Sequence, residues 1–167
     1  MKYKFCPMCG KELEIMQTWD EGEVPFCKDD NTMFFDLPKP CAVIAVIREE
    51  KILLLKQSYI YENSKVLVSG YVGVNETVEE TVVREVYEET GISIHKIQYL
   101  GSDFVDGKEL LMLTFMAFYE SGEINKSKEV EALEWIDLKK AIFHMEEDKV
   151  GRRVVEKVLH KLGYERG

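Results

Sequence analysis

The segment "NETVEETVVREVYEETG", residues 75–91, constrains the fold most, because both ends of a helix can be read from it. Thr77 is followed three residues later by Glu80, which is the spacing of a capping box, and Gly91 stands where helices commonly end in a left-handed residue. Val78, Val82 and Val86 recur every four residues and form an apolar stripe. The segment therefore predicts a helix that begins after Thr77, ends before Gly91 and packs one face on a core.

The same helix carries an acidic face. Glu85, Glu88 and Glu89 stand at i, i+3 and i+4, so they share one side of the helix, and like charges at that spacing destabilise it. One interpretation is a solvated charged face, the usual fate of a charge run. The other is a site for a hard divalent cation such as Mg²⁺, which takes carboxylate oxygens together with waters and phosphates. The tight clustering after the apolar strand "VLVSGYV" favours the cation site.

The remaining segments read as strands and one further helix. The runs "CAVIAVI" and "KILLLKQ", joined by "REE", have the pattern of a hairpin, and "VLVSGYV" reads as a third strand. Two β-rich runs follow, "SIHKIQYLGSDFV" and "ELLMLTFMAFYE", and then "VEALEWIDL", which reads as a strand that passes into a turn or short helix. Residues 148–163 have the apolar spacing of an amphipathic helix. These elements predict an α+β fold with a mixed sheet and helices packed on it.

The first part of the chain differs from the rest, because it is turn-rich and holds clustered cysteines. Cys6 and Cys9 form a CxxC pair, and Cys27 opens a second motif whose partner position is Asp30. Clustered cysteines in a reducing compartment indicate a metal site rather than disulfides. We therefore expect two domains, residues 1–36 and 38–167, joined at the linker-like "DLPKP". Cys41 stands apart and reads as a core residue of a strand.

Charge and hydropathy restrict the partners and the compartment. The chain of 167 residues has a formal net charge of −9, which disfavours binding to nucleic-acid phosphates. No apolar run approaches the roughly 20 residues of a membrane span, and the start "MKYKFCPMCG" has no apolar signal-peptide core. We therefore expect a cytoplasmic protein that does not bind membranes.

Residues 70–92 match every fixed position of the Nudix box, Gly-x5-Glu-x7-Arg-Glu-U-x-Glu-Glu-x-Gly-U, in which U is aliphatic. These fixed positions are Gly70, Glu76, Arg84, Glu85, Val86, Glu88, Glu89, Gly91 and Ile92. The chain therefore resembles the Nudix hydrolase family over about residues 38–167. The resemblance implies an αβα sandwich and an enzyme that uses Mg²⁺ or Mn²⁺ to hydrolyse a pyrophosphate linked to a nucleoside or another group.

The resemblance also implies roles for the box residues. Glu85 and Glu89 would be the main ligands of the cation, with Glu88 in support and the backbone carbonyl of Ser69 as a further ligand. Glu85 or Glu88 would orient the attacking water, so both are candidate catalytic residues.

The other fixed positions would be structural. The resemblance implies that Arg84 holds the carboxylates by charge-assisted hydrogen bonds and that Glu76 pairs with Arg84. Gly70 and Gly91 complete this structural set.

Within the family, the chain is most similar to the NADH pyrophosphatases, in which a zinc ribbon precedes the Nudix domain, as "FCPMCG" and "PFCKDD" do here. The implied zinc ligands are Cys6, Cys9, Cys27 and Asp30, with a structural role for the metal. Asp29 or a water are other candidates for the fourth ligand, since a tetrahedral site accepts oxygen. The alternative is a degenerate ribbon that keeps its fold by packing alone.

The subgroup also suggests residues outside the box helix. Glu129 takes the place of a loop-borne glutamate that binds metal and takes part in catalysis, and Glu131 is the other candidate for that place. The alternative for either residue is an ordinary charge at the rim of the site. Tyr71 would stack on a base or nicotinamide ring, unless it is an ordinary sheet side chain. Gly151 falls beside the substrate in the subgroup.

The chain departs from this subgroup after the box. The signature Ser-Gln-Pro-Trp-Pro-Phe-Pro-x-Ser is missing, and "GSDFVDGKELLM" offers Phe104 as its one aromatic candidate for substrate contact. The expected substrate is therefore a small nucleotide of a broader class that includes NADH, NAD⁺ and ADP-ribose. The subgroup often forms dimers, and a homodimer is the oligomer that this analogy suggests.

A second function, from another class, is a Nudix module that senses a nucleotide without cleaving it and whose ribbon binds a protein or nucleic-acid partner. The intact set Glu85, Glu88 and Glu89 argues against a pure sensor, since a sensor needs no complete catalytic set.

Overall fold

The computed structural model describes residues 3–105 and 107–164, so Asp106 and the extreme ends of both predicted domains lie outside the described part. The chain divides into two compact units, Met1–Pro38 and Lys39–Gly167. The boundary falls inside the predicted linker "DLPKP", because Lys39 and Pro40 already belong to the first strand of the larger unit. Proline is tolerated at the start of a strand, where its missing N–H costs no ladder hydrogen bond.

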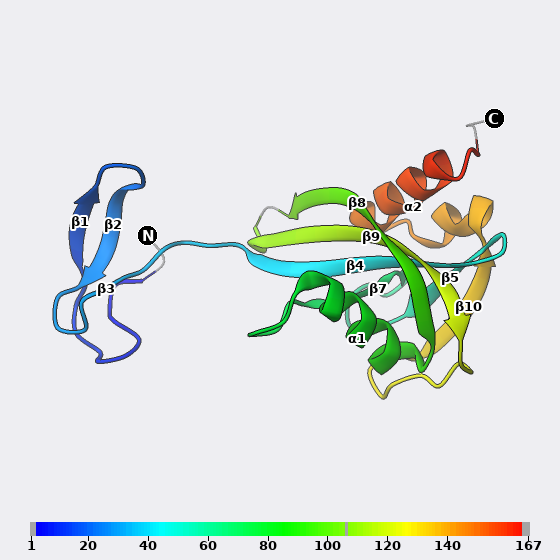
Figure 1. Cartoon of the computed structure of the whole chain (residues 1–167), viewed down its shortest axis with the longest axis horizontal. Helices are drawn as coiled ribbons and strands as arrows, with labels where there is room; N and C mark the ends of the chain where they lie inside the picture. Colours follow the sequence, from blue (N-terminus) through cyan, green and yellow to red (C-terminus); the bar gives the residue numbers. More distant parts are fainter. Residues whose placement is uncertain (1–2, 106, 165–167) are drawn as a thin grey trace. The chain divides into compact units, whose positions relative to one another are not determined.

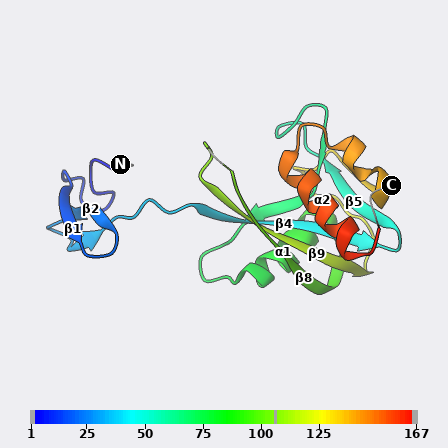
Figure 2. The same cartoon turned by 90° about the horizontal axis from the view of Figure 1, so that it is seen from above.

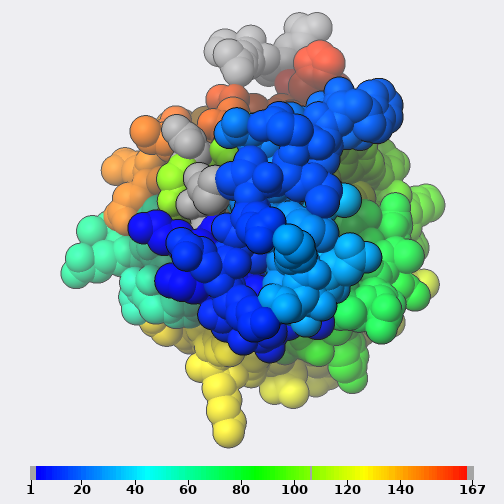
Figure 3. Space-filling model, turned by 90° about the vertical axis from the view of Figure 1, so that its left-hand side faces the viewer, coloured from blue at the N-terminus to red at the C-terminus, as the bar shows by residue number. Residues whose placement is uncertain are grey.

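The smaller unit, whose described residues are drawn in shades of blue in Figure 3, contains a short antiparallel sheet. Its strands β1 (Glu14–Thr18), β2 (Gly22–Cys27) and β3 (Thr32–Met33) pair in that order. Among its described residues, the buried apolar side chains are Cys6, Val24 and Cys27. So small a core does not stabilise a domain of this size without a disulfide, a metal or a partner.

The larger unit is built on a mixed sheet, seen between the helices in Figure 1. Among the described residues it has seven strands, and five of them follow the order β10-β5-β4-β9-β8, while β6 pairs with β5 and β7 with β4. Only the β4–β9 pair is parallel among these pairings. The bounds are β4 Lys39–Arg48, β5 Lys51–Lys56, β6 Lys65–Val66, β7 Val68–Tyr71, β8 Ser93–Val105, β9 Leu110–Ser121 and β10 Ala132–Asp137.

Helices cover both faces of this sheet (Figures 1 and 2). Helix α1 (Val78–Thr90) buries Val82 and Val86 in a core with one set of alternating β4 residues, including Ile44. The 3₁₀ helix η1 (Leu138–His144) and helix α2 (Lys149–Lys161) pack on the opposite set. The predicted α+β fold is confirmed as a helix–sheet–helix sandwich.

One predicted strand is divided. The run "VLVSGYV" forms β6 and β7, separated at Leu67, whose side chain is buried in the core of the α2 face. The two pieces pair with different strands, β5 and β4. A continuous apolar run shows that a segment is buried, but it does not show that the segment changes partner.

No helix in the described ranges 3–105 and 107–164 has the length and apolar character that a membrane span requires.

Candidate functional site

The box forms a strand–loop–helix unit on the α1 face of the sheet. In β7, Gly70 is paired with Ala42 of β4, and the loop after β7 leads into α1. Thr77 caps the helix, since its side chain accepts from the N–H of Glu80 while the Glu80 carboxylate accepts from the N–H of Thr77. Gly91 ends the helix with φ 74°. The predicted helix limits are therefore confirmed, and the glutamates stand on a helix that is fixed at both ends.

Arg84 organises the acidic face. Its Nε and Nη2 donate to the two oxygens of Glu76 at 2.7 and 2.9 Å, and Nη2 also donates to the carbonyl of Tyr71 at 3.1 Å. Its Nη1 donates to Glu85 Oε1 at 2.6 Å and to Glu88 Oε2 at 3.0 Å. The guanidinium is thus fully engaged within the unit, and it offsets the repulsion between Glu85 and Glu88.

Glu76 anchors Arg84 to the loop. One Glu76 oxygen also accepts from the N–H of Gly73 at 2.9 Å and from the hydroxyl of Thr81 at 2.8 Å. These donors, the Arg84 guanidinium first among them, lower the pKa of the Glu76 carboxyl to about 2. Glu76 is therefore an ionised structural group whose oxygens are already used.

Glu85 lies against the strand rather than out in solvent. A Cβ added at Gly70 would meet the Glu85 carboxyl carbon at 1.9 Å, so the carboxylate occupies the space that a side chain at position 70 would need. Burial raises the pKa of Glu85, and the hydrogen bond from Arg84 opposes that rise. Gly70 thus creates the space in which this carboxylate sits.

Glu89 is the most buried carboxylate of the face, with 8% of its surface exposed. Gln57 Nε2 donates to Glu89 Oε1 at 3.1 Å. Among the described residues, no group hydrogen bonds the buried Oε2. Burial raises the pKa of the Glu89 carboxyl to about 7, and the charges of Glu85 and Glu129 add to that rise while Gln57 opposes it. A buried carboxylate oxygen without a partner is costly, and a bound cation would satisfy it.

In the structure, Glu129 and Glu131 have different surroundings. Glu131 accepts from the N–H of Ser58 at 2.9 Å and from the Ser58 hydroxyl, and these bonds lower its pKa. The charge of Glu129 instead acts on Glu89 and on the exposed Tyr59, raising the pKa of each. Of these two residues, Glu129 is therefore the one whose charge affects a glutamate of the box, Glu89.

The carboxylate oxygens of the box glutamates do not all lie close together. Within the described part of the chain, one group of His, Cys, Asp and Glu side chains brings its ligand atoms within 4.8 Å of one another, and it is the cysteine cluster of the smaller unit. Glu85 and Glu88 both point at Arg84, and the Glu88 side chain is 58% exposed. A cation bound to several of these oxygens would therefore require side-chain rotation around Arg84.

The three residues predicted to contact the substrate lie on three different elements of the larger unit. Tyr71 follows Gly70 in β7 and has an exposed ring. Phe104 is exposed near the turn from β8 to β9, in register with Leu111. Gly151 lies in the first turn of α2, where its N–H donates to Asp148 Oδ1 at 2.8 Å. Since α2 covers the face of the sheet opposite α1, Gly151 is not brought together with the glutamates.

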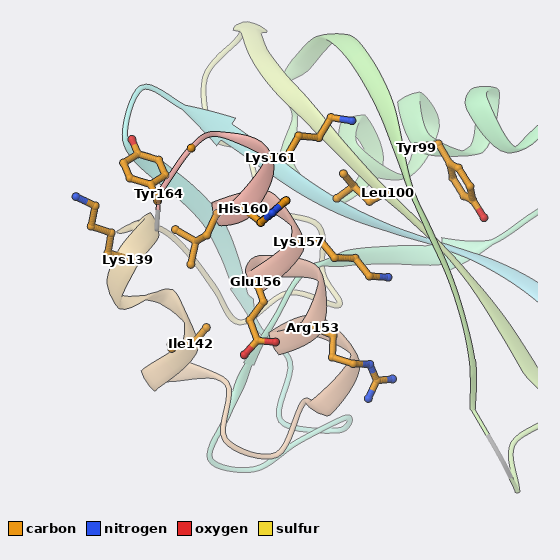
Figure 4. A pocket seen from close by; sticks show the side chains of 12 residues that line it. Tyr99, Leu100, Lys139, Ile142, Arg153, Glu156, Lys157, His160, Lys161 and Tyr164 are labelled. Carbon is orange, nitrogen blue, oxygen red and sulfur yellow. The ribbon is translucent and has the colours of Figure 1, made fainter. Parts of the chain in front are cut away.

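A second surface feature lies around α2, away from the box. A hollow of about 1630 Å³ is lined by several basic side chains, shown in Figure 4. These cations do not converge, because Arg153 and Lys157 turn to one side of α2 while Lys139 lies on the other (Figure 4). Arg153 and Lys157 both pair with Asp103 of β8, and Lys139 stacks over the ring of Tyr164. The arrangement stabilises the packing of α2 and gives no focused anion site.

The smaller unit brings Cys6, Cys9, Cys27 and Asp30 together. Asp30 Oδ2 lies 3.1 Å from Cys6 Sγ and 3.2 Å from Cys27 Sγ, and Cys9 Sγ lies 3.6 Å from Cys27 Sγ. Asp29 instead pairs with Lys11 at 2.8 Å. The Asp30 carboxylate raises the pKa of the Cys9 thiol to about 12, so zinc would have to displace thiol protons on binding. Three sulfurs and one oxygen at these separations fit a tetrahedral zinc site.

We expect that Asp30→Ala lowers zinc affinity by at least about tenfold and that Asp30→Cys raises it, since thiolate is the preferred ligand. Asp29→Ala is the matched control, because this neighbouring carboxylate pairs with Lys11 outside the cluster. Zinc content by elemental analysis and zinc release to a coloured chelator measure the effect. Loss of zinc in Asp29→Ala but not in Asp30→Ala would contradict the assignment of the fourth ligand.

The NUDIX domain family profile matches residues 38–158. Proteins named NAD-capped RNA hydrolase NudC are similar: that of Vibrio parahaemolyticus is 31% identical over 137 residues, 81% of this chain and 52% of the relative. That of Pectobacterium carotovorum is 34% identical over 134 residues, 80% of this chain and 50% of the relative. The chain therefore spans about half the length of the curated relatives it matches.

Solved structures show the same fold. A NUDIX hydrolase from Nitrosomonas europaea superposes with a TM-score of 0.78 at 19% identity, over 96% of this chain and 94% of that one. A UDP-X diphosphatase superposes with a TM-score of 0.65 at 20% identity, over 80% of this chain and 67% of that one.

Proposed function

Because this chain belongs to the NUDIX domain family, we propose that it is a hydrolase that uses Mg²⁺ or Mn²⁺ to cleave the pyrophosphate bond of a nucleoside diphosphate derivative of the NAD type. The observation that carries the proposal is a pair of largely buried carboxylates on α1, Glu85 and Glu89. Glu85 fills the space over Gly70, and Glu89 is buried with one oxygen unpartnered among the described residues. Such a pair is unfavourable in an apoprotein and becomes favourable when a cation binds.

The residues present fit a divalent cation. Glu85 and Glu89 would hold it, with the carbonyl of Ser69 at the adjoining strand, Glu88 in support and Glu129 from the loop. All of these donors are oxygens, as Mg²⁺ and Mn²⁺ prefer. When bound, the cation would neutralise charge on the pyrophosphate and lower the pKa of a bound water.

The chain's own residues have distinct tasks in this scheme. Arg84 holds Glu85 and Glu88 by hydrogen bonds, and it is too fully bonded to serve as a substrate contact. Glu88 is the more exposed of these two carboxylates, so we assign it the role of orienting the attacking water and accepting its proton. Tyr71 supplies an exposed ring beside the box for stacking on a base.

The substrate proposal draws on the relatives and on chemistry. The relatives are named NAD-capped RNA hydrolases, so an NAD-capped RNA joins NADH, NAD⁺ and ADP-ribose as a candidate. The net charge of −9 opposes a long RNA contact and favours the small dinucleotides. We therefore place NAD-type dinucleotides first.

The test is a substrate panel with Mg²⁺ or Mn²⁺, read by chromatography of the released mononucleotides. NADH, NAD⁺, ADP-ribose, a sugar nucleotide and an NAD-capped RNA are compared, each with a chelator arm and with Glu88→Gln as the reference variant. We expect turnover of at least one dinucleotide that requires metal and falls in the variant. Binding without turnover above that of the variant on any compound would favour a nucleotide-sensing module instead.

A further inference from the structure

The corner that follows β5 contacts two segments that carry proposed metal ligands. Strand β5 ends at Lys56, and Gln57 begins a tight turn, since its carbonyl accepts from the N–H of Ile60 at 2.9 Å. From this corner, Gln57 reaches α1 and Ser58 reaches the loop before β10. Two neighbouring residues of one turn therefore contact both sides of the candidate site.

Gln57 acts on Glu89. Its side chain is 2% exposed, and its Nε2 donates to Glu89 Oε1. An amide donor fixes one oxygen of the carboxylate and leaves Oε2 as the oxygen without a partner among the described residues.

Ser58 acts on the loop that carries Glu129. Glu131 accepts from both the N–H and the hydroxyl of Ser58, and the N–H of Glu131 donates to the carbonyl of Lys56 at 2.9 Å. The other side of the loop is fixed to the end of α1, where the N–H of Ser127 donates to the carbonyl of Glu89 at 3.2 Å. Glu129 thus lies between two points of attachment, one at α1 and one at the corner.

We propose that the Gln57–Ser58 corner is a positioning device that sets Glu89 and Glu129 at their working separation, with Gln57 orienting Glu89 and Ser58 holding the Glu129 loop through Glu131. The proposal rests on the proposed function, because it assigns the two carboxylates to one divalent-cation site. Neither Gln57 nor Ser58 touches substrate in this scheme. Partners that orient metal ligands in this way change metal affinity about 10–100-fold when removed.

The test measures Mn²⁺ affinity of the full-length protein without substrate, by calorimetry or electron paramagnetic resonance. We expect Gln57→Leu to weaken Mn²⁺ binding about 10–100-fold and Glu131→Ala to weaken it about tenfold. In kinetics with a dinucleotide, kcat at low Mn²⁺ falls, excess Mn²⁺ restores it, and KM for the dinucleotide stays within about twofold. Because bound metal also stabilises the folded state, the comparison is made on variants that remain folded without metal.

Gln17→Leu is the matched control. Gln17 Nε2 donates to Glu23 Oε1 at 3.0 Å in the smaller unit, the same kind of bond between residues that do not belong to the box, so Mn²⁺ affinity should not change. If Gln57→Leu does not fold, the exposed Glu131→Ala still tests the corner. Wild-type Mn²⁺ affinity in a folded variant overturns the proposal while the proposed function stands. Absence of Mn²⁺ binding by the unaltered protein overturns both.

Discussion

Glu89→Gln is expected to remove metal-dependent hydrolysis and, at the same time, to stabilise the metal-free fold above neutral pH. The glutamine keeps the shape of the side chain and can still accept the bond from Gln57, but it offers no charged oxygen to a cation. We expect turnover to fall at least about 100-fold, because a main ligand of the catalytic metal is lost.

Although this substitution lowers turnover, it stabilises the metal-free fold, because the pKa of Glu89 is raised in the folded chain. In the folded chain that pKa is about 7, against an ordinary value of 4.5, so the folded state holds this proton more tightly than the unfolded state does. The stabilising contribution of the protonated carboxyl is complete below the unfolded pKa and is lost as the pH rises through about 7. Removing the ionisable group therefore raises the free energy of unfolding at pH 8, by roughly 1–3 kcal/mol.

Denaturant unfolding at pH 5 and pH 8, with and without Mg²⁺, measures this effect. The unaltered protein should lose stability between these pH values without metal and regain it with Mg²⁺, while Glu89→Gln should show a smaller change of each kind. Glu79→Gln is the control, since Glu79 is an exposed carboxylate in the first turn of the same helix. Equal Mg²⁺ stabilisation of the unaltered protein and Glu89→Gln would show that Glu89 does not hold the cation.

Local patterns in the sequence predicted much of the frame around this site. The capping residue Thr77, the terminal Gly91 and the stripe Val78, Val82 and Val86 are properties of a few consecutive residues, and the structure confirms them. The break of the third predicted strand at Leu67 could not be predicted, because it depends on which strand each half pairs with. Pairing partners are set by the whole sheet rather than by the segment.

The supporting residues of the site were missed for a similar reason. Gln57 and Ser58 belong to no motif and stand 32 and 73 positions from their partners Glu89 and Glu131, so no local pattern indicates them. The Cys-x-x-Asp spacing favoured Asp30 over Asp29 as the fourth zinc ligand, and the geometry shows why the two carboxylates differ. In the structure Lys11 engages Asp29 and leaves Asp30 facing the sulfurs.

Gly70→Ala is expected to displace Glu85 and to lower turnover by about 10–100-fold. The reason is space rather than backbone conformation. The backbone of Gly70 lies outside the left-handed region, so alanine could adopt it, but its Cβ would lie 1.9 Å from the Glu85 carboxyl carbon. The carboxylate must leave its place against the strand, and with it the hydrogen bond from Arg84 at 2.6 Å. Misplacement of a reacting or ligating group by about 1 Å costs on the order of 100-fold in rate.

A double-mutant cycle with Glu85→Ala isolates that clash. In the unaltered background, Gly70→Ala should destabilise the fold, because a β-strand alanine is forced against a charged side chain. In the Glu85→Ala background the same substitution should stabilise by about 0.4–1 kcal/mol, the usual gain when alanine replaces glycine at a permissive backbone position. Since the two residues touch, this sign reversal is the coupling that such a cycle detects. Equal effects of Gly70→Ala in both backgrounds would mean that Glu85 does not occupy the space above the glycine, and the cation site built on that contact would have to be abandoned.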